Sequence, residues 1–188
     1  FCLAIAAFVS LTPGVLYAKT SPLEGKWYTT KPEKNAVIEI ARCTPDGDTF
    51  CGTIVQLQTP NYPDGTPKID KENKNEKLRT RPIMGMHLLT GFKKDGENSW
   101  GDGKIYNPED GDIYSCEITL EKEGEKESLL VRGYVGVPLF GKTQTWLRLK
   151  EGESPAWPQK KEDSSKEDNL NNEQKEKADF IKEDQDDN

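Results

Sequence analysis

The feature that most constrains the fold is a series of eight short runs rich in β-branched and aromatic residues, spread over residues 25–150. The runs are GKWYTT, NAVIEIARC, TFCGTIVQLQ, MHLLTGFKK, NSWGDGKIY, DIYSCEITLEK, ESLLVRGYVG and KTQTWLRLK. Turn sequences such as PDGD, DGEN, NPEDG and EGEK separate most of them, and such turns join antiparallel strands. We therefore predict an all-β fold, a single antiparallel eight-stranded up-and-down barrel, since closure also removes the exposed edges of the sheet.

The sixth run has the clearest alternation of apolar and polar residues. This period of two is typical of a strand with one face in a core and the other in solvent. The side chains predicted to face the barrel interior, and to line any ligand cavity there, are Tyr114, Cys116, Ile118 and Leu120.

The register of the seventh run decides how polar that interior is. If the hairpin at Gly124 pairs positions whose numbers sum to 248, one set faces inward: Leu130, Arg132 and Tyr134. If the sum is 247, the alternate set faces inward: Leu129, Val131 and Val135. The first register would give an Arg132–Tyr134 clamp for a carboxylate. The second buries more apolar surface, turns Arg132 to solvent and is favoured, with both left open.

Residues 136–143, GVPLFGKT, match the spelling of a phosphate-binding loop. Such a loop needs a helix after it, whose N-terminus helps to bind the phosphates. The following TQTWLRLK alternates with a period of two and predicts a strand. We interpret Gly136 and Gly141 as the two ends of a hairpin loop and expect no nucleotide to bind.

Residues 1–18 are apolar and uncharged, with Pro13-Gly14 in the middle and Ala18 before the first lysine. This pattern is typical of a cleaved secretory signal peptide, with a membrane-spanning anchor as the alternative. We therefore expect an exported, soluble protein with no stable membrane anchor.

Cys43 and Cys51 flank a turn-rich segment between two predicted strands. In an exported protein this arrangement predicts a cross-strand disulfide. Cys116 is left over among apolar neighbours, where an inert buried thiol is favoured over a catalytic one.

Charge is distributed unevenly along the 188 residues. Residues 151–188 carry thirteen acidic and six basic side chains, a balance of −7 that equals the charge of the whole chain. We predict that this segment is a disordered acidic tail that follows one barrel domain at residues 22–150. The body, residues 1–150, is neutral and lacks the basic surface expected of a nucleic-acid-binding protein.

No combination of residues predicts catalysis or a cofactor. His87 is the only histidine, so a serine or cysteine triad would depend on it and a histidine-rich metal site is impossible. The polar connection at residues 58–82 is long enough to be a functional loop or a lid, but its mixed charges argue against a dedicated anion site. We predict that the protein is not an enzyme.

Several short motifs resemble a family of exported bacterial proteins, domain of unknown function 2147. The matching pieces include Gly25-Lys-Trp27, Cys43 with Cys51-Gly52, Asp70-Lys-Glu-Asn73, Arg79-Thr-Arg81-Pro82, Gly103-Lys-Ile-Tyr106, Arg132-Gly-Tyr134 and Gly141-Lys-Thr-Gln-Thr-Trp146-Leu-Arg148. Gly25-Lys-Trp27 also resembles the G-x-W motif that opens lipocalins. The resemblance implies a lipocalin/calycin-like barrel in a Gram-negative periplasm, with Trp27 closing one end and Arg148 packed across it.

Two functions follow as hypotheses. The first is a periplasmic binding protein for a small hydrophobic or amphipathic ligand, such as a fatty acid or lipid, because an eight-stranded barrel can hold one such molecule. The second is a non-catalytic envelope module with a filled barrel, which contacts a protein partner. A ligand-sized cavity would favour the first hypothesis, and a solid core with an apolar surface patch would favour the second.

Overall fold

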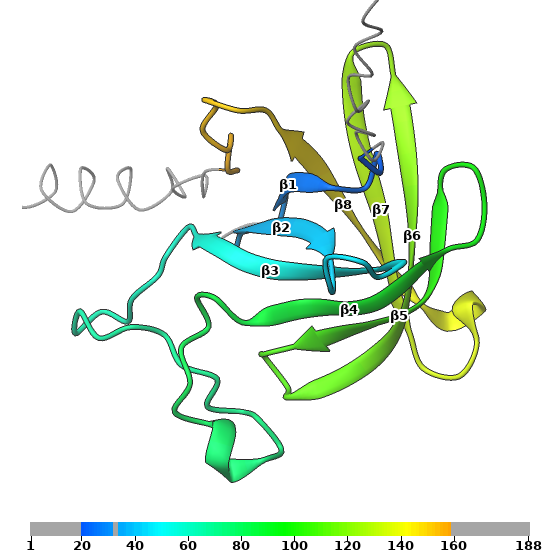
Figure 1. Cartoon of the computed structure of the whole chain (residues 1–188). Helices are drawn as coiled ribbons and strands as arrows, with labels where there is room; N and C mark the ends of the chain where they lie inside the picture. Colours follow the sequence, from blue (N-terminus) through cyan, green and yellow to red (C-terminus); the bar gives the residue numbers. More distant parts are fainter. Residues whose placement is uncertain (1–19, 32–33, 159–188) are drawn as a thin grey trace, which may run out of the picture.

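The computed structural model describes residues 20–31 and 34–158 of the chain. Within these residues, eight strands form a closed barrel in which each strand pairs antiparallel with the next and β1 pairs with β8 (Figure 1). The predicted eight-stranded up-and-down barrel is thus confirmed. The predicted signal peptide at residues 1–18, and residues 159–188 of the predicted tail, lie outside the described residues.

The strands follow the eight sequence runs closely. They are β1 (Gly25–Thr29), β2 (Ala36–Arg42), β3 (Thr49–Leu57), β4 (His87–Lys94), β5 (Ser99–Asn107), β6 (Asp112–Glu123), β7 (Lys126–Tyr134) and β8 (Lys142–Leu149). Two short 3-10 helices, η1 (Glu76–Leu78) and η2 (Pro138–Phe140), lie in the β3–β4 and β7–β8 connections. Because β8 begins at Lys142, residues 136–143 form a hairpin loop that runs into a strand.

The β6–β7 hairpin corrects the predicted register. Glu123 pairs with Lys126, so the turn has two central residues, and the first of them is Gly124 with a φ of 60°. Paired positions therefore sum to 249, as in Cys116 with Gly133, and neither predicted sum is observed. A sum of 249 turns the same residues inward as 247 does, so Arg132 lies outside the barrel. The register that placed Arg132 inside, and with it the carboxylate clamp, is wrong.

One end of the barrel is closed by side chains. Trp27 is fully buried and donates its indole N–H to the carbonyl of Leu23 at 2.9 Å. The guanidinium carbon of Arg148 lies 3.7 Å from the centre of the Trp27 ring, in the arrangement that the lipocalin resemblance implies. Arg148 also donates to the carbonyls of Glu24 at 2.6 Å and Pro22 at 2.5 Å, and to the carboxylate of Glu127 at 2.8 Å. These bonds fix the segment before β1 across the base of the barrel.

Above this base the interior is packed solid with apolar side chains. The core includes Trp100, Phe92, Leu89, Phe50, Leu129 and, from β6, Cys116, Ile118 and Leu120. Each of these side chains exposes 4% of its surface or less, so the lower part of the barrel holds no room for a ligand.

The connections differ greatly in length. β2 and β3 are joined by a short hairpin that the predicted Cys43–Cys51 disulfide crosses, with a Cα–Cα distance of 4.9 Å. The β3–β4 connection, residues 58–86, is by contrast a long excursion that stands away from the strands in teal and green (Figure 1). In the described part of the chain, no helix has the length and apolar character needed to cross a membrane.

Candidate functional site

A cavity of about 910 Å³ opens at the end of the barrel opposite Trp27. It lies where β1, β3, β5 and β7 end and where the other four strands begin. Its floor is apolar and is made by Ile38, Ile54, Val131 and Trp146, which are all buried. Partly buried apolar residues continue the wall upward: Leu57, Ile83, Leu88 and Ile105. A cavity of this size and lining fits a ligand with an apolar part.

The rim of the cavity carries most of its charge. Five lysines border it, namely Lys31, Lys34, Lys68, Lys71 and Lys142, together with Glu72, Glu109 and Asp110. Lys34 pairs with Glu109 at 3.1 Å and Lys71 with Glu72 at 3.8 Å. Among the described residues that border it, five cationic and three anionic side chains give the mouth a cationic excess above an apolar floor.

Asp110 and Tyr114 form a polar pair in the wall. The Tyr114 hydroxyl donates to the Asp110 carboxylate at 2.8 Å, and the Asn107 amide donates to the same carboxylate at 2.8 Å. Burial acts to raise the pKa of Asp110, but these bonds and one from the backbone N–H of Asp112 together lower it. Asp110 therefore stays ionised and fully hydrogen-bonded rather than available as an acid.

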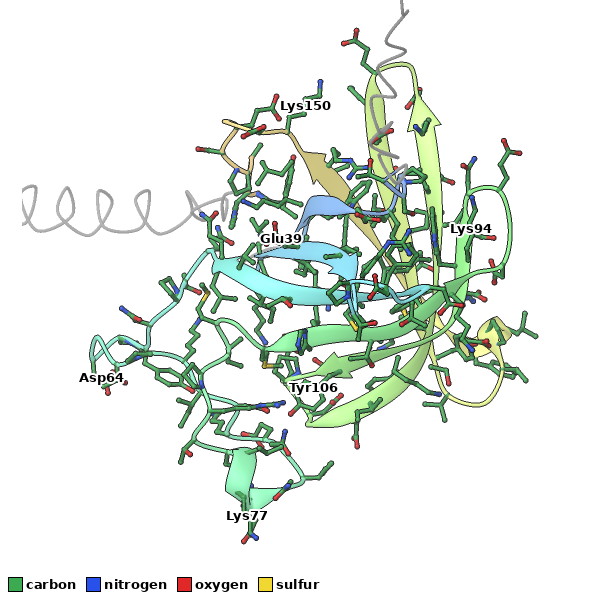
Figure 2. The ribbon with its side chains drawn as sticks, viewed as in Figure 1. Glu39, Asp64, Lys77, Lys94, Tyr106 and Lys150 are labelled. Carbon is green, nitrogen blue, oxygen red and sulfur yellow. A yellow bond between two sulfur atoms is a disulfide. The ribbon has the colours of Figure 1, made fainter. Side chains whose placement is uncertain are left out.

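A buried carboxylate ties the β3–β4 excursion to the barrel. Asp70 is 0% exposed and accepts hydrogen bonds from Asn73 at 2.7 Å, from Arg81 at 2.8 Å and from the hydroxyl of Tyr106 at 2.6 Å. Tyr106 belongs to β5, whereas the other three residues belong to the excursion. In Figure 2, Tyr106 lies on the part of the barrel next to the excursion, whose outer parts carry Asp64 and Lys77. Burial, followed by the bond to Asp70 and the charge of Asp70, raises the pKa of Tyr106 to about 12, so its hydroxyl keeps its proton at neutral pH and donates to Asp70.

The excursion meets the barrel a second time at the β5–β6 turn. A Cβ on Gly111 would collide with the carbonyl oxygen of Glu72, so only glycine admits this contact. Fixed at both places, the excursion contributes seven residues to the cavity lining: Thr59, Tyr62, Lys68, Ile69, Lys71, Glu72 and Ile83. It is therefore one side of the mouth rather than a loose appendage.

Comparison with known proteins bears on the family and on the fold. The model of a family described as uncharacterized proteins conserved in bacteria, DUF2147, matches residues 25–148. The chain belongs to this family. No curated protein matches the chain. Among solved structures, protein HP1028 from the human pathogen Helicobacter pylori, described as belonging to the lipocalin family, is similar with 29% identity and a TM-score of 0.58. That match covers 70% of this chain and 86% of the other.

The barrel of this DUF2147 protein is therefore lipocalin-like. Lipocalin-like barrels are suited to holding a small ligand inside the open end, which is where the cavity lies. In this chain the longest connection joins β3 and β4. This connection, the excursion, forms one side of the cavity mouth.

The predicted site residues of the DUF2147 chain fall into three places. Tyr114 and Tyr134 line the cavity. Cys116, Ile118 and Leu120 have the predicted inward orientation but lie in the packed core below the cavity. Arg132 lies on the outer side, where it donates to the carbonyls of Pro138 and Leu139 and to the hydroxyl of Thr143. Alternation in the sequence identifies the face of a strand that points inward. It does not show which inward positions lie in the packed core and which border the cavity.

Residues that sequence reasoning missed come mainly from the excursion. Asp70, Asn73, Arg81 and Tyr106 appear in the motifs shared with the family, yet the charges of the excursion by themselves indicate only a mixed polar segment. An Asp and an Arg separated by eleven residues, with a Tyr in a later strand, carry no spacing signal for a buried network.

The one histidine and the free thiol of the described residues lie away from the cavity lining. His87 is exposed, does not border the cavity and is hydrogen-bonded at 3.0 Å to Thr53. Burial raises the pKa of Cys116 to about 12, so this thiol is not an activated nucleophile. Within residues 20–31 and 34–158, His, Cys, Asp and Glu side chains form no group suited to a metal ion. The cavity itself combines an apolar floor with a charged rim.

Proposed function

We propose that this protein binds a small amphipathic ligand, such as a fatty acid or a lipid, in the open half of its barrel. The observation that carries the proposal is the cavity of about 910 Å³, which has an apolar floor and a lysine-bearing rim. An acyl chain would lie against Ile38, Ile54 and Val131, and its polar or anionic head would stay near the lysines. Such a division of contacts is typical of sites that bury most of a ligand and orient it by a few polar groups.

We also propose that the protein works in the periplasm. The apolar segment at residues 1–18 predicts export, and the Cys43–Cys51 disulfide favours an oxidising compartment. A carrier in that compartment would shield an apolar chain from water between two membranes.

Native mass spectrometry tests the proposal directly. The protein is recovered from the periplasm of a Gram-negative host, its mass is measured intact, and the bound material is extracted into organic solvent and identified. We expect one amphiphile per chain. A bare polypeptide mass, together with no binding of palmitate or cis-parinaric acid on titration, would contradict the proposal.

A matched pair of variants locates the site. Ala36 is buried and borders the cavity, whereas Ala41 lies on the outer face of the same strand and is exposed. We expect Ala36→Phe to fill the mouth and weaken binding of cis-parinaric acid by about tenfold or more, and Ala41→Phe to leave it unchanged. The fluorescence of cis-parinaric acid measures both. Equal affinity in the two variants would place the ligand elsewhere.

The alternative hypothesis, an envelope module with a partner, has one observation in its favour. The β7–β8 loop exposes a group of apolar side chains of the kind that marks an interaction surface. The cavity disagrees with the filled barrel of that hypothesis, whereas the exposed apolar side chains agree with its interaction surface.

A further inference from the structure

The β7–β8 loop carries an unusual concentration of exposed apolar surface. Val135, Val137, Leu139 and Phe140, here named the apolar tip, are 74%, 52%, 78% and 79% exposed. Among the described residues only three other large apolar side chains are exposed: Leu78, Met84 and Ile113. Four such side chains within six residues favour a binding surface over chance exposure.

The backbone of the tip is held firmly by polar bonds. Arg132 donates to the carbonyl of Pro138 at 2.8 Å and to that of Leu139 at 3.2 Å, and its third bond reaches Thr143 at 2.9 Å. The Gly141 N–H closes the 3-10 turn on the Pro138 carbonyl at 2.9 Å. These bonds hold the backbone of residues 138–141 in place. The loop therefore presents its exposed apolar side chains from an ordered backbone, which lowers the backbone entropy lost on binding.

The tip stands at the mouth of the cavity. Val135 and Phe140 belong both to the tip and to the cavity lining, and Lys142, directly after the loop, also borders the cavity. In Figure 1 the loop, in yellow around η2, projects beyond the strands. A projecting apolar tip beside Lys142, at a mouth that carries four further lysines, fits a lipid interface, where acyl chains adapt to any shape and anionic head groups attract cations. A protein partner would need a groove complementary to the tip.

We propose that the apolar tip docks this protein onto an anionic lipid bilayer, with Leu139 and Phe140 inserted at the head-group level and the mouth lysines against the head groups. The docking is peripheral and reversible, since four side chains bury far less apolar surface than a membrane-spanning segment. This inference goes beyond ligand binding. Together, ligand binding and membrane docking would place the open mouth of the barrel against the bilayer. An amphiphile could then enter or leave with little exposure of its acyl chain to water.

Vesicle flotation of the exported protein tests the docking. The vesicles are made of phosphatidylethanolamine with phosphatidylglycerol, and a second set is made of phosphatidylcholine alone. The variant is Val137→Asp with Leu139→Asp, because neither residue borders the cavity. The matched control is Leu78→Asp with Met84→Asp, two apolar residues of the β3–β4 excursion that are 37% and 39% exposed.

We expect the wild-type protein to float with the anionic vesicles, and several-fold less with phosphatidylcholine. The tip variant should bind the anionic vesicles about tenfold more weakly, and the control variant should bind as the wild type does. An unchanged circular dichroism spectrum shows that each variant is folded.

Docking would be overturned by no flotation of the wild type, by equal loss of binding in both variants, or by equal binding of the tip variant and the wild type. Cross-linking of position 139 to an envelope protein, without vesicle binding, would overturn it in favour of a protein partner. Titration of the tip variant with cis-parinaric acid keeps the two proposals apart, because its cavity lining is intact. Loss of flotation with ligand binding retained supports docking, whereas failure of ligand binding in every form contradicts only the proposed function.

Discussion

At the scale of single residues, Arg148 closes one end of the barrel through several contacts made by one side chain. Its guanidinium stacks on Trp27 and donates to two backbone carbonyls and one carboxylate. The planar group can satisfy all of these partners at once, which a lysine cannot. Gly25 belongs to the same arrangement, since a Cβ there would approach Nη1 of Arg148 to 2.9 Å.

We expect Arg148→Ala to lower the free energy of unfolding by about 2 to 4 kcal/mol, because it takes the donor from two carbonyls and from Glu127 and removes the stacking on Trp27. Urea unfolding followed by tryptophan fluorescence measures the change. Arg42→Ala is the control, because Arg42 is exposed, bonds one carbonyl and pairs with Glu24 only at 3.8 Å. Arg42→Ala should lower the free energy of unfolding by less than about 1 kcal/mol. Equal losses would show that Arg148 is not the cap of the barrel.

Cys116 predicts a dependence of stability on pH. Burial raises its pKa from 9.0 to about 12, so the folded protein keeps a proton that the unfolded chain releases. Stability is therefore unaffected below about pH 9 and falls by about 1.4 kcal/mol per pH unit above it, until the folded thiol also ionises. In Cys116→Ala the free energy of unfolding should fall less steeply above pH 9, by about 1.4 kcal/mol per pH unit.

Tyr106→Phe is the control for this measurement. The pKa of Tyr106 is raised from 10.0 to about 12, so removal of its hydroxyl should flatten the curve only above about pH 10. Denaturant unfolding at a series of pH values gives both slopes. If wild type and Cys116→Ala have parallel curves between pH 9 and 10, the thiol is not buried as described.

At the scale of elements, the sequence predicts the strands correctly, but the predicted register of β6 with β7 is wrong. The alternation in residues 112–121 identifies both faces of β6 because one face must be buried. The pairing of β6 with β7 depends on the turn, and a glycine at the first of two turn residues is typical of a two-residue hairpin. A two-residue turn that begins at Gly124 places Glu123 opposite Lys126, a sum of 249. The predicted sums of 247 and 248 do not correspond to such a turn.

The position of the β3–β4 excursion against the barrel could not be predicted from the sequence, for a different reason. Its position depends on Asp70 meeting Tyr106, which lies 36 residues later, and on the close contact of Glu72 with Gly111. Contacts between distant segments leave no periodic signal in the sequence. The apolar floor of the cavity was partly predictable, whereas the side of the mouth built by the excursion was not.

We expect Gly111→Ala to detach the excursion from the barrel. Gly111 has a φ of 71°, so an alanine there is strained by about 1 to 2 kcal/mol and also collides with the Glu72 carbonyl. Gly124→Ala is the control, because Gly124 has a φ of 60° but a Cβ there would have no atom within 4 Å. Hydrogen exchange of residues 70–82 should increase in the first variant alone. Similar exchange in both would show that the contact at Gly111 does not hold the excursion.

At the scale of the whole molecule, the barrel is divided into a packed half and an open half. Three tryptophans, Trp27, Trp100 and Trp146, are almost completely buried, and the last of them is also part of the cavity floor. Most apolar burial, and so most stabilisation, comes from below the cavity. The mouth carries the excursion, the lysines and the apolar tip, which are the parts proposed to meet a ligand and a bilayer.

The pairing of β1 with β8 has a consequence for biosynthesis. The barrel closes between the first and last strands, and Arg148 bonds a carbonyl 126 residues before it. A nascent chain that has not yet delivered residue 149 has two open sheet edges and no cap over Trp27. Open edges are the surfaces through which unfinished β-proteins aggregate. For this chain, the interval in which both edges are exposed ends only when almost the entire barrel sequence has been released.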